Sequence, residues 1–410
     1  MNNLTHLLVA VLISLQSLAF SQMHEVSRDY VDPDTGHRIV RLSDEPGSQS
    51  FYFHQNGYTA SGDKVVFSTP KGLSAYNFKT KKLELIVEGR AGSVVVGPKT
   101  RKVFYLRGES VFETDIDTKA TREIAKDARL RSGSGFALNA DETLLGGSMV
   151  TAEIPAEFGP QPPQPAPTPN AAGQVPARDS YPGKGDMMER RLAAKIPMSL
   201  YTINIKGGEI KTFHPATDWL NHVQFSPTDS TLMMFCHEGP WHKVDRIWTI
   251  RTDGSELKKI HTRTMEMEIA GHEFFSPDGR YILYDLQTPK YEVFWLAQYE
   301  IKTGKLTKHS LQKREWSVHY NMSPDGKIFS GDGGGPNSVA RGDNGQWMYL
   351  FKSENGKMKS ERLVNLAKHD YSLEPNGTFT PDGKWIVFRS NMFGPTHVFA
   401  VEVEKAVAKN

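Results

Sequence analysis

Three histidines occupy the same place in three consecutive repeats of the sequence. His222, His272 and His319 each lie four residues before the serine of a Ser-Pro turn, in NHVQFSPTD, HEFFSPDG and VHYNMSPDG. Equivalent positions in neighbouring repeats lie at one level, so we expect the three imidazoles to converge. A histidine can remove a proton from carbon, while a cation takes up the charge that develops on an adjacent carboxylate. The pattern favours β-elimination on a uronic acid sugar.

The densest group of ionisable residues is FCHEGPWHKVDRIW, residues 235–248, which also contains the single cysteine of the chain. We interpret it as the end of a strand and the loop after it, which presents Arg246 to a substrate carboxylate. His237 and His242, together with His222, are predicted to contact the substrate. An equally good interpretation is that His237 and His242 only hydrogen-bond the ends of a hairpin.

The elements that position these residues are predicted from a repeated turn of the type Ser/Thr-Pro-Asp-Gly. Clear copies are FFSPDGRYILYD (274–285), YNMSPDGKIFSGD (320–332) and TFTPDGKWIVFRS (378–390), and four weaker copies bring the total to seven. Proline presets φ, aspartate caps the turn and glycine takes the left-handed position, as in a β-hairpin. A second hairpin lies between copies, so the sequence predicts an all-β fold, a seven-bladed β-propeller.

One blade carries an insertion. Residues 150–198 include PAEFGPQPPQPAPTPNAAGQVPARDSYPGKG, in which proline disfavours both helices and sheets. We expect a proline-rich insertion with a short helix at MMERRLAAK, residues 187–195. The alternative is a tether between two half-domains.

The N-terminus indicates export. Residues 7–20, LLVAVLISLQSLAF, have the length of the apolar core of a signal peptide and end at a small-x-small site, so residues 1–21 are predicted to be removed. The mature propeller lyase domain is then 22–410, periplasmic or secreted. No other apolar run is long enough for membrane insertion. The formal net charge is only +2, so nucleic acid is not an expected partner.

Other reaction classes find less support. No Gly-x-Ser-x-Gly nucleophile motif occurs, and no pair of carboxylates stands out as in a glycosidase. The run GDGGG, residues 331–335, lacks the Lys-Ser/Thr ending of a phosphate-binding loop.

Several of these segments resemble a known family. FCHEGPWHKVDRIW, GHEFFSPDG, SVHYNMSPDGKIFSGDG and EPNGTFTPDGKWIVFRSNMFG resemble, in order and spacing, the oligogalacturonate lyases, propellers of polysaccharide lyase family 22. The likeness covers essentially the whole mature chain. It implies an acidic oligosaccharide substrate, cleavage by β-elimination and a 4,5-unsaturated uronate product.

The resemblance also implies roles for individual residues. His272 matches the base that removes the C5 proton of the galacturonate. Arg246 matches the arginine that holds the substrate and helps neutralise its carboxylate, and His319 matches a ligand of the catalytic divalent cation, manganese in the type enzymes.

The sequence departs from the family at the metal site. The family has Gln-x-x-His-x-His before the last Phe-x-Pro-Asp turn, whereas this chain has YSLEPN, residues 371–376. Glu374 and Asn376 stand in place of the two histidines, which predicts a His319–Glu374–Asn376 site suited to Mn²⁺ or Ca²⁺. Alternatives are a site without metal, a lyase for another uronate polymer such as ulvan or rhamnogalacturonan, and a non-catalytic secreted propeller that binds oligosaccharide or protein.

Overall fold

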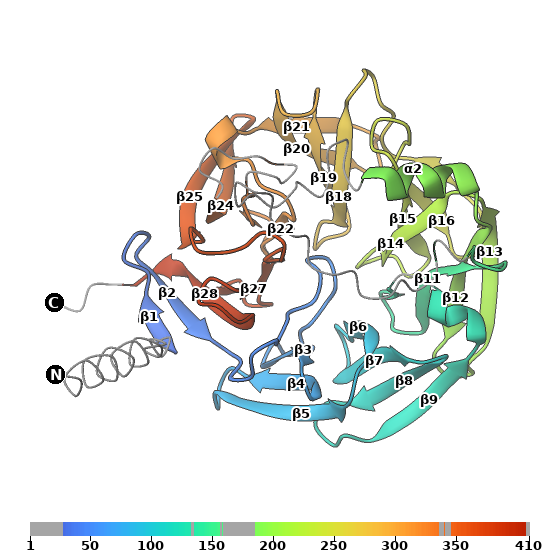
Figure 1. Cartoon of the computed structure of the whole chain (residues 1–410), viewed down its shortest axis with the longest axis horizontal. Helices are drawn as coiled ribbons and strands as arrows, with labels where there is room; N and C mark the ends of the chain where they lie inside the picture. Colours follow the sequence, from blue (N-terminus) through green and yellow to red (C-terminus); the bar gives the residue numbers. More distant parts are fainter. Residues whose placement is uncertain are drawn as a thin grey trace, which may run out of the picture.

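The computed structural model describes residues 28–132, 135–155, 158, 185–335, 340 and 346–406. The predicted signal peptide, residues 1–21, and most of the predicted insertion lie outside the described residues. The described strands form six hydrogen-bonded sheets that are arranged in a ring around a central axis (Figure 1). No helix in the described ranges is long and apolar enough to cross a membrane.

The sheets follow one another along the chain. The first four contain β3 (Lys64–Thr69), β4 (Gly72–Asn77) and β5 (Lys82–Glu88); β6 (Gly92–Val96), β7 (Lys102–Arg107), β8 (Ser110–Asp115) and β9 (Thr121–Lys126); β10 (Ala137–Leu138), β11 (Leu144–Val150), β12 (Met198–Asn204) and β13 (Ile210–Ala216); and β14 (Trp219–Phe225), β15 (Leu232–Glu238), β16 (Ile247–Arg251) and β17 (Lys258–Lys259). All pairings within these sheets are antiparallel, as hairpins require.

The fifth sheet has eight strands, in the order β18 (Ile269–Phe275), β19 (Tyr281–Gln287), β20 (Phe294–Glu300), β21 (Leu306–Ser310), β25 (Lys357–Asn365), β24 (Trp347–Glu354), β23 (Ile328–Gly331) and β22 (Asn321–Met322). Its two antiparallel halves meet in one parallel bridge, Ser310 to Lys357. The 3-10 helix Lys313–Glu315 lies in the connection between them.

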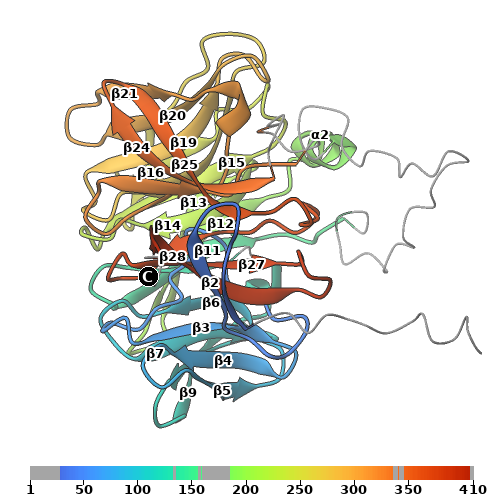
Figure 2. The same ribbon diagram turned by 90° about the vertical axis from the view of Figure 1, so that its left-hand side faces the viewer.

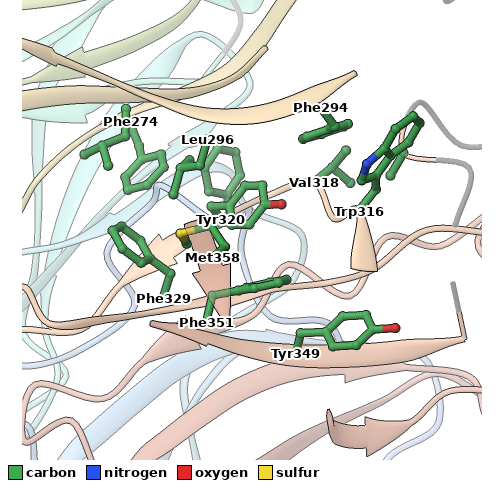
Figure 3. Packing of buried hydrophobic residues seen from close by; sticks show 13 residues of the cluster. Phe274, Phe294, Leu296, Trp316, Val318, Tyr320, Phe329, Tyr349, Phe351 and Met358 are labelled. Carbon is green, nitrogen blue, oxygen red and sulfur yellow. The ribbon is translucent and has the colours of Figure 1, made fainter. Parts of the chain in front are cut away.

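The two halves also pack against each other through side chains. Figure 3 shows Phe274 and Leu296 of one half near Phe329 and Phe351 of the other, and Phe294 beside Val318 and Trp316 of the connection between the halves. Burying one such side chain contributes about 1.5–3 kcal/mol. This cluster therefore fixes the relative position of β18 and β22, which are the two end strands of this sheet.

The ring is closed by both ends of the described chain. β1 (Asp29–Val31) pairs with β2 (His37–Arg41), and β2 pairs with β28 (His397–Lys405), which is followed in the sheet by β27 (Trp385–Ser390) and β26 (Thr378–Phe379). Figure 2 shows β2 beside β27 and β28 from the side. Circular closure of this kind leaves few exposed sheet edges.

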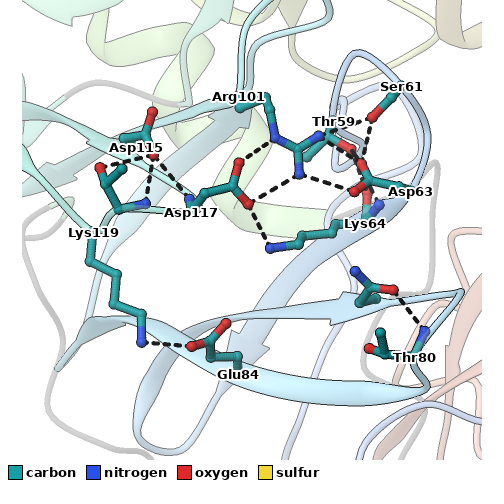
Figure 4. Close-up of polar contacts among 12 residues, drawn as sticks. Thr59, Ser61, Asp63, Lys64, Thr80, Glu84, Arg101, Asp115, Asp117 and Lys119 are labelled. Atoms are coloured by element: carbon teal, nitrogen blue, oxygen red, sulfur yellow. Dashed lines mark hydrogen bonds and ion pairs between the residues drawn. The ribbon is translucent and has the colours of Figure 1, made fainter.

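A charged network joins the first two sheets on the outer surface. Arg101 donates to Asp63 at 2.7 Å and to Asp117, and Lys64 contacts Asp117 at 2.7 Å (Figure 4). We call these four residues the rim network.

The insertion leaves and re-enters one sheet. Val150, the last residue of β11, pairs with Met198, the first residue of β12. The described part of the insertion includes α2, Gly185–Ala194, which overlaps the helix predicted at 187–195.

Candidate active site

The site is built on one repeated backbone position. His222, His272 and His319 have φ of 48°, 50° and 49°, and Asn376, four residues before Thr380, has φ of 53°. Residues other than glycine seldom adopt this left-handed region. At His222 and His272 the strand register shifts, as in a β-bulge, a feature that re-aims side chains. The three predicted histidines therefore share one local geometry, and Asn376 is a fourth member of the set.

His272 lies at the centre of the cluster. Its Nδ1 is 2.6 Å from Oδ1 of Asp285, and its side chain is 13% exposed. The ring centroids of His272 and His319 are 4.5 Å apart, and Trp241 contacts His272 edge-on at 5.7 Å. A partly accessible imidazole is thus held against a buried carboxylate.

His319 is the buried neighbour. Its Nδ1 is 2.8 Å from Oδ2 of Asp332, and its Nε2 lies 3.7 Å from Oε2 of Glu374. This Nε2 is buried and has no hydrogen-bond partner among the described residues. Although burial acts to lower the pKa of His319, the Asp332 and Glu374 carboxylates raise it above the ordinary value. The Glu374 side chain is 50% exposed, so the pair opens toward solvent.

Asn376 is buried, and its side chain bonds two backbone groups. Its Oδ1 accepts a hydrogen bond from the Phe53 N–H at 3.2 Å, and its Nδ2 donates to the Glu374 carbonyl at 3.1 Å. Both ends of the amide are therefore used to hold backbone. The described part of the chain contains no group of three His, Cys, Asp or Glu side chains placed to hold a metal ion, and the predicted site of His319, Glu374 and Asn376 stays a prediction.

A loop between β2 and β3, blue in Figure 1, runs into the centre of the ring. The ring of Tyr52 contacts His222 and His319 at centroid distances of 5.5 and 5.4 Å, and His54 lies 5.9 Å from His222. A cavity of about 140 Å³ is lined by Tyr52, His54 and His222 among others. Burial, followed by the charge of His222, lowers the pKa of His54 to about 3. His54 is therefore a neutral wall of this cavity.

Arg246 is held by a buried ion pair. Its Nη1 lies 2.8 Å from Oε1 of Glu238, and the two side chains are 4% and 2% exposed. Glu238 also contacts His222 Nε2 at 3.2 Å. Burial acts to raise the pKa of Glu238, but Arg246 and His222 bring it well below the ordinary value. A Cβ on Gly271 would lie 3.8 Å from Arg246 Nε, so the arginine reaches the residue that precedes His272.

The other two histidines predicted to contact the substrate are His237 and His242. His237 packs against Phe235 and Trp248 of its own sheet, with ring centroids 5.4 and 4.9 Å away. His242 is half-buried in the turn after β15. In this turn Lys243 forms an ion pair with Glu189 of α2 at 2.7 Å. Of the three predicted contacts, His222 is the one whose ring contacts Tyr52 and Glu238 of this cluster.

Several residues of the site were not predicted from the sequence. Asp285 and Asp332 each follow their histidine by 13 residues, and this constant spacing was the signal that could have found them. Glu238 lies within the quoted cluster but was not singled out. Tyr52 and His54 carry no such signal, because they come from outside the repeats that bear the other histidines.

Comparison with known proteins gives consistent results. The family model for oligogalacturonate lyase matches residues 190–407. The chain is 25% identical over 406 residues to the oligogalacturonate lyase of Dickeya dadantii (strain 3937), an alignment that covers 92% of this chain and 96% of the relative.

Solved structures show the same fold. An oligogalacturonate lyase in complex with manganese is 23% identical, with 92% of this chain and 96% of that one covered and a TM-score of 0.74. The β-propeller domain of Cps50 (Swd1) from Myceliophteria thermophila is 10% identical, with 88% and 98% covered and a TM-score of 0.51. The predicted propeller type of fold and the predicted family are both confirmed. Since the family model spans more than half of the 410 residues, the chain belongs to the oligogalacturonate lyase family and is a polysaccharide lyase, a carbon–oxygen lyase.

Proposed function

We propose that the protein cleaves galacturonate oligosaccharides of pectin by β-elimination, with His272 as the base that removes the C5 proton. The observation that carries this proposal is the placement of His272. Its partly accessible ring contacts the buried Asp285 and lies next to His319, which in turn lies near Glu374. Loss of a proton next to a carboxylate builds up negative charge, which a cationic surrounding stabilises more in the transition state than in the ground state. The product is a 4,5-unsaturated uronate.

Arg246 is proposed to help neutralise the substrate carboxylate. Burial acts to lower its pKa, but Glu238, Glu273 and Cys236 surround it and raise the pKa above the ordinary value, so it is cationic. Its Nε has no hydrogen-bond partner among the described residues. Because Glu238 already pairs with Arg246, a substrate carboxylate must share the guanidinium with it.

The residues fit a divalent cation in part. The unpartnered, buried Nε2 of His319 and the half-exposed carboxylate of Glu374 are an imidazole and an oxygen ligand that suit Mn²⁺. A hard cation held by few protein groups completes its coordination with water and substrate. When bound, such a cation would withdraw charge from the substrate carboxylate. We leave Asn376 out of the proposed ligand set, because its buried amide already bonds two backbone groups.

We also propose that the ring has seven blades. The eight-stranded sheet is joined by a single bridge, and its halves pack face to face through buried side chains, as two blades would. Counted in this way, the six sheets give seven units. The proline-rich segment within 150–198 is then an insertion in the blade of β11 and β12.

For the whole chain we propose export to the periplasm or the medium, with residues 1–21 as the signal peptide. Mass spectrometry of the mature protein is expected to find Gln22 at its N-terminus. A mature chain that keeps the first 21 residues would contradict export by this route.

The test of the activity is the ultraviolet absorbance of the unsaturated uronate. We expect absorbance to rise when the protein is mixed with oligogalacturonate. The assay is run both with and without added Mn²⁺. Rhamnogalacturonan and ulvan oligosaccharides are assayed in parallel, and a rise with one of these alone would move the specificity to that polymer. If no uronate gives a rise but oligosaccharide binds, the protein is a non-catalytic sugar-binding propeller.

A further inference from the structure

Two histidine–aspartate pairs lie side by side at the axis. His272 contacts Asp285 at 2.6 Å, and His319 contacts Asp332 at 2.8 Å, in both cases through Nδ1. Each aspartate follows its histidine by 13 residues. Both histidines have the left-handed backbone described above. The same histidine–aspartate arrangement therefore occurs in two consecutive repeats of the fold.

The position of the aspartate is set by the strand register. Gly271, which precedes His272, pairs with Asp285 of β19. In the repeat before, Asn221 precedes His222 and pairs with Cys236. In the last repeat, Arg389 donates its backbone N–H to the carbonyl of Pro375, which precedes Asn376. Cys236 and Arg389 are thus the structural equivalents of Asp285.

The fold therefore does not require a carboxylate at this place. A thiol occupies it in one repeat and a guanidinium in another. The ring of His222, which has no aspartate at this place, bonds Glu238 instead. Aspartate is present where the neighbouring residue is His272 or His319. This distribution ties Asp285 to the histidine and not to the folding of the blade.

The contact decides which nitrogen of His272 carries the proton. A neutral imidazole has one N–H, and an ionised carboxylate can only accept a hydrogen bond. Asp285 is fully buried, so water does not compete for its Oδ1. With Asp285 ionised, the hydrogen bond at 2.6 Å places the proton on Nδ1 and leaves a lone pair on Nε2 of the neutral ring.

We propose that Asp285 is the positioning residue of the base in this enzyme, an inference that rests on the proposed function. Asp285 holds the Nδ1–H of His272, so that Nε2 takes the C5 proton, and its charge stabilises the imidazolium that forms. The electrons of the C5–H bond form the C4–C5 double bond. The C4–O4 bond breaks with its electron pair on the leaving oxygen, which takes a proton from water. The imidazolium then returns its proton to solvent.

The first test reads the tautomer in the unmodified protein. Two-bond nitrogen–proton correlation spectra of ¹⁵N-histidine-labelled protein distinguish Nδ1–H from Nε2–H. The resonances of His272 are assigned by their loss in the His272→Ala variant. We expect Nδ1 to carry the proton, and a neutral ring protonated on Nε2 would overturn the proposal.

The second test is the isosteric variant Asp285→Asn. We expect kcat to fall on the order of 10²-fold or more, as for other partners that orient a catalytic imidazole. KM should change by less than about threefold, because the lost interaction strengthens only in the transition state. The matched control is Asp278→Asn, which removes a carboxylate from the turn of the same hairpin, where it bonds Ser276. We expect kcat of this variant to stay within about twofold of the parent.

The outcomes separate this inference from the proposed function. If His272→Ala keeps full turnover, His272 is not the base and both fail. If His272→Ala is inactive while Asp285→Asn keeps kcat, only the role of Asp285 is overturned. If Asp285→Asn does not fold, the tautomer in the unmodified protein decides.

Discussion

Two charged networks of this protein use the same residue types in opposite settings. In the rim network, Arg101 pairs with Asp63 at 2.7 Å, and these side chains are 31% and 37% exposed. At the axis, Arg246 pairs with Glu238 at 2.8 Å, and these side chains are 4% and 2% exposed. The distances are alike, and the difference lies in the access of water.

That difference decides what each network contributes. Water screens the rim pairs, so each is worth about 0.2–1 kcal/mol. At the axis, removal of both charges from water costs several kcal/mol, which the ion pair and its hydrogen bonds only offset. A buried pair is therefore an inefficient way to stabilise a fold. It is an effective way to hold a charge at one place beside a reacting group.

The largest effect is expected for His272→Ala. Removal of the proposed base should lower turnover on the order of 10²- to 10⁴-fold, measured as the initial rate of the absorbance rise. The control is His309→Ala in β21, where the imidazole contacts Ser353 away from the axis. Equal activity of the two variants would show that the axial histidine cluster is not the active site.

Next in size is the loss of the axial ion pair. Glu238→Gln leaves Arg246 as an uncompensated buried charge and should lower the free energy of unfolding by about 3–5 kcal/mol. This is measured by urea denaturation. The double variant Glu238→Gln/Arg246→Met should lose less than the sum of the two single variants. If the changes in unfolding free energy are strictly additive, Glu238 and Arg246 are not energetically coupled.

A smaller effect is expected for Glu374→Gln. If His319 and Glu374 hold a divalent cation, loss of the carboxylate charge should weaken Mn²⁺ binding by about 10- to 100-fold. The readouts are calorimetric titration with Mn²⁺ and the recovery of activity after treatment with a chelator. Unchanged Mn²⁺ affinity in this variant would exclude Glu374 as a ligand.

The smallest effect belongs to the rim and depends on pH. Arg101, followed by Lys64, lowers the pKa of Asp117 from 3.8 to about 2, although burial opposes the shift. Because the folded-state pKa is depressed, the stabilisation is present above the unfolded-state pKa of 3.8 and is lost as pH falls through about 2. The difference in unfolding free energy between the parent and Asp117→Asn should be about 0.2–1 kcal/mol at neutral pH and should decrease as pH falls from 3.8 through about 2. A difference that is the same at both pH values would contradict an ionic origin.

Much of the architecture could be read from local patterns. The Ser/Thr-Pro-Asp-Gly turns indicate hairpins, because each turn residue favours a particular backbone conformation at its own position. The β fold and the shared position of the three histidines were therefore predictable. The same local argument identified the helix that is α2. Partners across strands were harder to find, because Asp285 meets His272 only through the pairing register.

Two parts of the site were not predictable by these means. The amide of Asn376 is engaged by Phe53, more than 300 residues away in sequence, so its substitution for a family histidine did not reveal its use. The burial of Arg246 depends on Glu238, on Trp241 and on the close approach of the arginine to Gly271, none of which follows from spacing alone.

The sequence by itself determined the family, the β fold and the candidate base, because these depend on residue types at short, repeated spacings. The tertiary structure alone decided the partners: Asp285 and Asp332 on the two imidazoles, Glu238 on Arg246, and the loop of Tyr52 and His54 at the axis. The physical reason is that strand pairing sets the partners within each sheet, while ring closure brings the Tyr52–His54 loop to histidines of other sheets. The charge and orientation of each group depend on burial and hydrogen bonds that exist only after that closure.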